Sequence, residues 1–189
     1  MNRRQFVTRS IVSGLALSAV NSQASVNNSA HAINNSELMI DVESFTVSDV
    51  IQFLQGLPLE RLVTAGQWNL SQIFNHAAQS IEFSIMGYPI NKSEIFRRSI
   101  GPLAFQGFAL WGKMTHGLAE GIPGAPALAL DDDSAALQRL IQALSHFDQF
   151  KGQLQPHFAY GDLSKEEYAL AHVLHLNNHL EEVSLVQTA

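Results

Sequence analysis

Apolar residues recur at intervals of three and four along the chain from Phe45 onward, a spacing typical of amphipathic α-helices. Capping residues and helix breakers divide this pattern into separate segments. Four principal helices are expected from Thr46 to Gly56, from Asn69 to Gly87, from Asp133 or Ser134 to before Gly152, and from Ser164 to about Glu182.

Glycine and proline interrupt the chain between these helices. The apolar pattern of residues 94–119 is broken at Gly101-Pro102 and at two further glycines, which predicts one kinked helix or two short ones. Residues 121–133 and 152–163 are expected to be loops. No run of alternating apolar and polar residues competes with the helices. The expected fold is therefore all-α, a four-helix bundle with one long crossover connection and extra short helices.

Residues 1–24 have a different pattern. Arg3 and Arg4 precede an apolar stretch at residues 11–20, and small residues lead to a candidate cleavage site at Ala24. This layout predicts an export signal, and the arginine pair resembles the twin-arginine (Tat) motif. An uncleaved anchor and a chance basic start are the alternatives, although about 20 apolar residues are needed to cross a bilayer. We therefore expect the Tat translocase as a partner during export and a periplasmic location.

Composition narrows the chemistry that residues 25–189 can perform. Residues 25–40 are rich in Asn, Ser and Ala without periodicity and are expected to form a flexible leader, whereas residues 41–189 have the size of one domain. The chain has no cysteine, so any metal site must be built from His, Asp, Glu or water. Its formal charge is -6 and no basic run occurs outside the signal, so we expect no nucleic-acid partner.

Histidines supply the candidate chemistry. His172, His175 and His179 lie three and four residues apart in the last predicted helix. At 100° per residue their side chains point within about 60° of one another. His76 lies on an otherwise apolar face of the second predicted helix. We expect His76, His175 and His179 to bind one metal ion, because three protein nitrogens leave an open position for water or substrate.

Neighbouring side chains allow several roles. His172 is expected to orient a ligand or water next to the metal, and the alternative is a fourth ligand. Gln72 and Ser80 flank His76 by one turn each and are candidate substrate contacts. If no metal binds, all these histidines are core residues satisfied by hydrogen bonds. His146 falls off the apolar stripe of its helix and is expected to be solvated.

Several segments carry a resemblance to a known family. Residues 68–76, 80–84 and 87–89 resemble the second-helix signature of the DinB/YfiT-like branch called domain of unknown function 1569. Residues 156–158, residues 163–168 and the histidine triplet at 172, 175 and 179 resemble the C-terminal half of that family, so that the likeness covers roughly residues 41–183.

In that superfamily a four-helix bundle holds a divalent metal through one histidine of the second helix and a His-x-x-x-His pair of the last. The resemblance implies the same trio of His76, His175 and His179 as ligands. It also implies, for some members, transfer or addition chemistry on low-molecular-weight thiols.

Three functions are compatible with these observations. The first is an exported metal-dependent enzyme, of hydrolase or transferase type, that acts on an unidentified small molecule. The alternative is a non-catalytic periplasmic module that binds metal or another ligand, and the third is a purely structural bundle. Three imidazoles suit zinc, nickel, iron and copper alike, so the sequence leaves the divalent ion open. It is also compatible with a homodimer.

Overall fold

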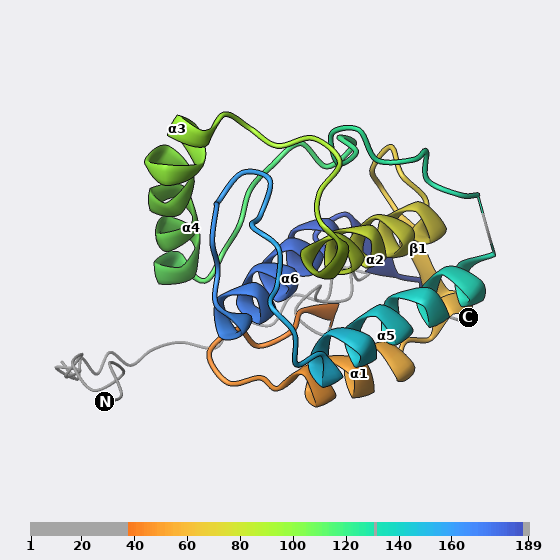
Figure 1. Cartoon of the computed structure of the whole chain (residues 1–189). Helices are drawn as coiled ribbons and strands as arrows, with labels where there is room; N and C mark the ends of the chain where they lie inside the picture. Colours follow the sequence, from red (N-terminus) through yellow and green to blue (C-terminus); the bar gives the residue numbers. More distant parts are fainter. Residues whose placement is uncertain (1–37, 131, 187–189) are drawn as a thin grey trace, which may run out of the picture. The chain divides into compact units, whose positions relative to one another are not determined.

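The computed structural model describes residues 38–130 and 132–186. In this part of the chain six α-helices form a bundle, which confirms the all-α class (Figure 1). They are α1 (Val47–Gln55), α2 (Leu70–Met86), α3 (Glu94–Arg98), α4 (Ile100–Trp111), α5 (Asp133–Gln149) and α6 (Lys165–Leu180). A 3-10 turn, η2, covers Leu59–Arg61. None of the helices in the described ranges combines the length and the apolar character that a membrane span requires.

Side-chain caps fix where the helices begin. Thr46, Asn69 and Ser164 each accept a hydrogen bond from the backbone three residues on and receive a reciprocal bond, so α1, α2 and α6 all start with a capping box. The cap of α5 is Asp132 and not Asp133 or Ser134 as predicted, because the Asp132 carboxylate accepts hydrogen bonds from two backbone N–H groups of the first turn. Gly87 ends α2 as predicted.

The hydrophobic core lies mainly between α2 and α5. α2 lies between α5 and α6 and contacts both, and α5 also packs against α1 (Figure 1). Fully buried apolar side chains fill these contacts, among them Leu54, Ile73, Phe74, Leu140, Phe147 and Leu180. Each such side chain contributes about 1.5 to 3 kcal/mol on burial. This packing provides the rigid support for the polar face that α2 turns toward α6.

Two short strands were not predicted. β1 (Leu62–Thr64) pairs antiparallel with β2 (Val183–Leu185), with Thr64 opposite Val183. They carry no sequence signal, because three residues are too few to show a period of two, and they leave the all-α class unchanged. The pairing ties the chain that leaves α6 to the segment that enters α2.

The region between residues 94 and 119 forms two short helices, α3 and α4, one of the two predicted outcomes. They stand at one side of the bundle, where α4 contacts α6 (Figure 1). A long connection then leads from Gly112 to α5. It is fastened to α2 where the Gln79 side-chain amide donates to the Pro126 carbonyl (3.1 Å) and the Asn75 amide donates to the Ala129 carbonyl (3.4 Å).

The loop between α5 and α6 packs tightly against α4. Within this loop His157 and Gly161 exchange two backbone hydrogen bonds of 2.7 and 3.1 Å. Gly101 of α4 touches the backbone of this loop so closely that a Cβ atom there would overlap the Ala159 carbonyl oxygen. Gly107, two turns further along α4, has open space where its Cβ would be.

Gly101→Ala should therefore destabilise the fold by about 1 to 3 kcal/mol, because the loop backbone must shift to admit the methyl group. Gly107→Ala is the matched control, since it adds the same methyl group without a collision. It should leave stability unchanged or raise it by up to about 1 kcal/mol through helix propensity. Thermal unfolding measures both effects. Equal melting temperatures for the two variants would contradict this description of the contact.

Candidate metal centre

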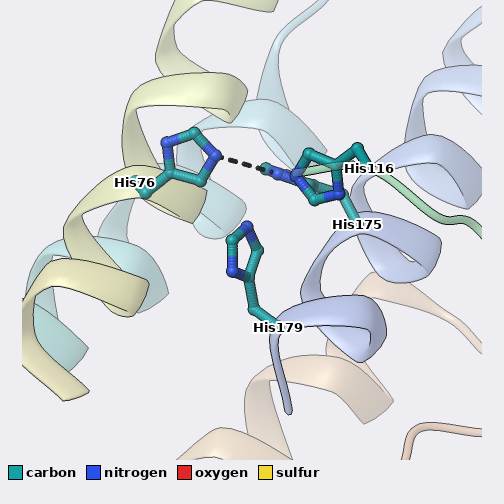
Figure 2. A group of neighbouring side chains, drawn as sticks. All are labelled: His76, His116, His175 and His179. Atoms are coloured by element: carbon teal, nitrogen blue, oxygen red, sulfur yellow. Dashed lines mark hydrogen bonds between the residues drawn. The ribbon is translucent and has the colours of Figure 1, made fainter. Parts of the chain in front are cut away.

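Four histidines from three parts of the chain meet at one point. His76 comes from α2, His175 and His179 come from α6, and His116 comes from the connection after α4 (Figure 2). One ring nitrogen of each lies within 4.8 Å of the others. The two α6 histidines are one turn apart, so both rings project toward α2. We call these four residues the histidine cluster.

One nitrogen–nitrogen distance in the cluster is close to that expected for two ligands of the same ion. The Nε2 atoms of His76 and His175 are 3.0 Å apart (Figure 2). Two lone pairs at that distance repel unless a proton or a cation lies between them. Two nitrogens that each lie roughly 2.0 to 2.1 Å from one tetrahedral ion are about 3.3 Å apart. The spacing therefore fits a pair of ligands on one divalent metal.

Unpartnered nitrogens give independent support. Both ring nitrogens of His179 are buried and have no hydrogen-bond partner among the described residues, so one of them can bind an ion without losing another contact. An unsatisfied buried polar atom costs about 1 to 3 kcal/mol, so native proteins seldom gather several of them without a ligand. The residues present fit a bound metal ion.

Burial also keeps the cluster in the protonation state that a metal needs. Desolvation, with a smaller contribution from His116, lowers the pKa of His76 to about 4. Desolvation and the neighbouring His76 lower the pKa of His179 to about 2. The pKa of His175 is well below its ordinary value, again chiefly because of burial. All three rings are neutral at pH 7 and have lone pairs to offer.

Sequence reasoning missed His116. It lies in the connection between α4 and α5, which has no helical period that could place it on a face. The Asn178 side-chain oxygen accepts both the His116 backbone N–H (3.2 Å) and the ring Nδ1–H (2.6 Å). A backbone N–H can only donate, so the atom it faces must be the amide oxygen, and Nδ1 must carry the ring proton. His116 therefore presents Nε2 as an acceptor, the usual orientation of a histidine ligand held by a second residue.

Trp68 covers the cluster on the side away from the connection. Its ring stacks on His179 with centroids 5.5 Å apart and an angle of 15°, and it contacts His76 at 4.8 Å. His76 and His179 are buried, whereas His175 is half-buried and His116 is exposed. A ligand therefore reaches the cluster from the side of His116 and His175.

A cavity of about 360 Å³ opens on that accessible side. His76, His116 and His175 form part of its wall. Aromatic side chains from α3, α4 and the loop before α6 form much of the rest, namely Phe96, Phe108, Phe158 and Tyr160. Apolar walls with a few polar groups at one end are typical of a small-molecule site.

The structure separates the other predicted site residues. Ser80 borders the cavity, but Gln72 does not, because its side chain accepts the Asn69 backbone N–H in the α2 capping box. His172 borders the cavity too and lies outside the histidine cluster. Its ring packs against Phe147 and Tyr168, and its Nε2 is buried with no partner among the described residues. Its role next to the metal stays a prediction.

One further histidine, His157, forms part of the cavity wall. Its Nδ1 accepts hydrogen bonds from the backbone N–H groups of Ala159 and Tyr160, both 3.1 Å long. Burial, with a smaller contribution from His172, lowers the pKa of His157 to about 3. The unfolded chain therefore binds a proton at this residue near pH 6.5, whereas the folded chain does not until far lower pH. Stability contributed by the neutral ring is lost as the pH falls below 6.5.

His157→Asn should reduce this pH dependence. The asparagine side-chain oxygen can accept the same two backbone N–H groups, yet it does not titrate. Between pH 7 and pH 5 the metal-free variant should lose about 2 kcal/mol less unfolding free energy than the metal-free wild type. Urea unfolding at both pH values measures the difference, and His146→Asn on the exposed side of α5 is the control. An unchanged pH dependence in His157→Asn would show that this ring is not held neutral.

Comparison with known proteins places the chain in a family. Searches of curated proteins and of solved structures found no match. The sequence model of one family, described as a protein of unknown function (DUF1569), matches residues 39–185. The wider DinB-like relationship stays a prediction from the sequence. The match spans nearly all of the described residues, and the chain therefore belongs to the DUF1569 family.

Proposed function

We propose that this protein is a metal-dependent enzyme, of hydrolase or transferase type, that acts on a small molecule bound in the cavity. The observation that carries the proposal is the histidine cluster itself, in which four imidazoles from three segments meet next to a cavity with aromatic walls and both ring nitrogens of His179 are buried without a partner among the described residues. A structural bundle would gain nothing from this arrangement, because each unsatisfied nitrogen lowers its stability.

The residues have separable tasks in this proposal. His76, His175 and His179 would hold the ion, which when bound supplies Lewis-acid chemistry to a substrate oxygen or to a water or thiol nucleophile. Asn178 fixes the tautomer and the position of His116. Trp68 excludes water from the buried side of the cluster, so substrate can approach only through the cavity.

His116 decides between an enzyme and the alternative function. Four imidazoles complete a tetrahedral shell, which is typical of a structural or storage site, whereas a catalytic site keeps a position open. The presence of a fourth histidine therefore favours a non-catalytic metal-binding module as the second candidate. We favour the enzyme because His116 is exposed and belongs to a connecting segment, so that it can be displaced more easily than the three helix-borne histidines.

Export is a separate part of the proposal. The residues that carry the predicted Tat signal and most of the predicted leader lie outside the described residues. A periplasmic location and passage through the Tat translocase stay predictions from the sequence. A Tat substrate folds before export, which would allow the metal to be loaded in the cytoplasm.

Alanine variants of the cluster test the proposal. His76→Ala, His175→Ala and His179→Ala should each abolish stoichiometric divalent metal, because each removes one of the three ligands held on helices. His116→Ala should keep the ion with affinity about 10- to 100-fold weaker, since the three helix-borne histidines remain. Elemental analysis and competition with a chelating dye measure both effects.

His146→Ala is the matched control, because its ring lies on the exposed side of α5 and should not affect metal content. Full metal occupancy in His76→Ala would contradict the proposed ligand set. Complete loss in His116→Ala would instead make His116 an essential fourth ligand and favour the non-catalytic module.

A further inference from the structure

The wall of the cavity contains polar side chains that do not belong to the histidine cluster, among them Lys92 and His157. Of the described residues that border it, Lys92 is the only lysine or arginine. The lysine lies between α2 and α3, and its Nζ is 5.3 Å from the centroid of the Phe96 ring. Phe96 borders the cavity as well, so a ligand in the cavity can contact an ammonium group and an aromatic ring at neighbouring positions.

The backbone around Lys92 is fixed. Its N–H donates to the Phe158 carbonyl at 2.9 Å, and its own carbonyl accepts from Arg97 Nε at 3.1 Å. Both contacts join Lys92 to segments that form the cavity wall. The ammonium group is therefore attached to a held backbone and not to a free loop, which lowers the entropy lost when it binds a ligand.

No carboxylate among the described residues forms an ion pair with Lys92. Glu120 borders the same cavity, but its carboxyl carbon lies 2.6 Å from where a Cβ of Gly117 would be, so the side chain folds back over its own turn. Lys92 is an exposed residue, so its ammonium group can pair with the anionic group of a ligand that enters the cavity.

His157 adds a hydrogen-bond donor to the same cavity. Because its Nδ1 accepts two backbone N–H groups, the neutral ring must carry its proton on Nε2. Both of the ring's hydrogen bonds are made by Nδ1, so Nε2–H remains available to a ligand in the cavity. The ring is also stacked on Tyr160, with centroids 4.2 Å apart and an angle of 4°, which prevents it from turning away.

We propose that the cavity binds a small aromatic carboxylate, whose anionic group is recognised by Lys92 and His157 while its ring lies among Phe96, Phe158 and Tyr160. The proposal rests on the proposed function, since it takes this cavity to be the substrate site. It adds to the proposed function the chemical class of the substrate. The volume of about 360 Å³ suits a ligand with a single ring, at the small end of ligand sites.

Benzoate and its neutral analogue benzamide are suitable probes, because they have nearly the same shape and differ in charge. Their binding to the metal-free and the zinc-loaded protein can be measured by NMR titration. Benzoate should bind the metal-free protein about tenfold more tightly than benzamide, because only the carboxylate forms a charge-assisted bond with Lys92. Zinc is not needed for this preference.

Lys92→Met should remove the preference by weakening benzoate about tenfold while changing benzamide less than twofold. Lys92→Arg should restore most of it. Lys151→Met is the matched control, because Lys151 is exposed like Lys92 but does not border the cavity. His157→Asn should weaken benzoate by a smaller factor, about threefold, because a neutral donor is lost.

Two results would overturn the proposal. One is benzoate binding that requires zinc and is unaffected by Lys92→Met, since the carboxylate would then be a metal ligand. The other is equal binding of benzoate and benzamide, or no binding of either, to the metal-free protein. A failure of the proposed function looks different, because the protein would then bind no zinc while the preference for benzoate persisted in the cavity.

Discussion

The close approach of two neutral imidazoles, His76 on α2 and His175 on α6, is the constraint on which the site depends. Their facing nitrogens are 3.0 Å apart, and burial lowers the pKa of both rings so that they are neutral at pH 7. Hydrophobic burial between α2 and α5 holds α2 in place, so the bundle can tolerate a polar contact with α6. A divalent ion would replace this contact by a cross-link between α2, α6 and the His116 segment.

The same arrangement covers the site on one side and leaves it open on the other. Trp68 closes the cluster where His76 and His179 are buried, whereas the cavity opens where His116 and His175 are accessible. The α4 helix and the loop before α6 complete the cavity, and they meet at the backbone contact of Gly101 with Ala159. The aromatic side chains of the wall and the histidines of the cluster thus come from different segments.

Much of the fold could be predicted from the sequence because helix caps and helical spacing are local features of the chain. Thr46, Asn69 and Ser164 are capping residues whose effect needs no tertiary contact. His76, His175 and His179 could be singled out because helical spacing puts them on apolar or converging faces. The structure brings these three together, and their role as metal ligands stays a prediction.

Tertiary placement explains what the sequence could not show. His116 sits in a segment without a period, and only its bonds to Asn178 reveal its orientation. Likewise the Lys92 backbone is fixed by a distant partner in the chain, the Phe158 carbonyl. The strands β1 and β2 form because two segments far apart in the sequence pair with each other. A stretch of three residues is too short to predict such a pairing.

X-ray absorption spectroscopy of the zinc-loaded protein tests the central claim most directly, because it counts the ligands of the ion without relying on activity. We expect one zinc per chain with three or four nitrogen scatterers at roughly 2.0 to 2.1 Å and the multiple-scattering pattern of imidazole. A first shell made only of oxygen, or zinc bound without imidazole scattering, would contradict the assignment of the histidine cluster as the metal centre.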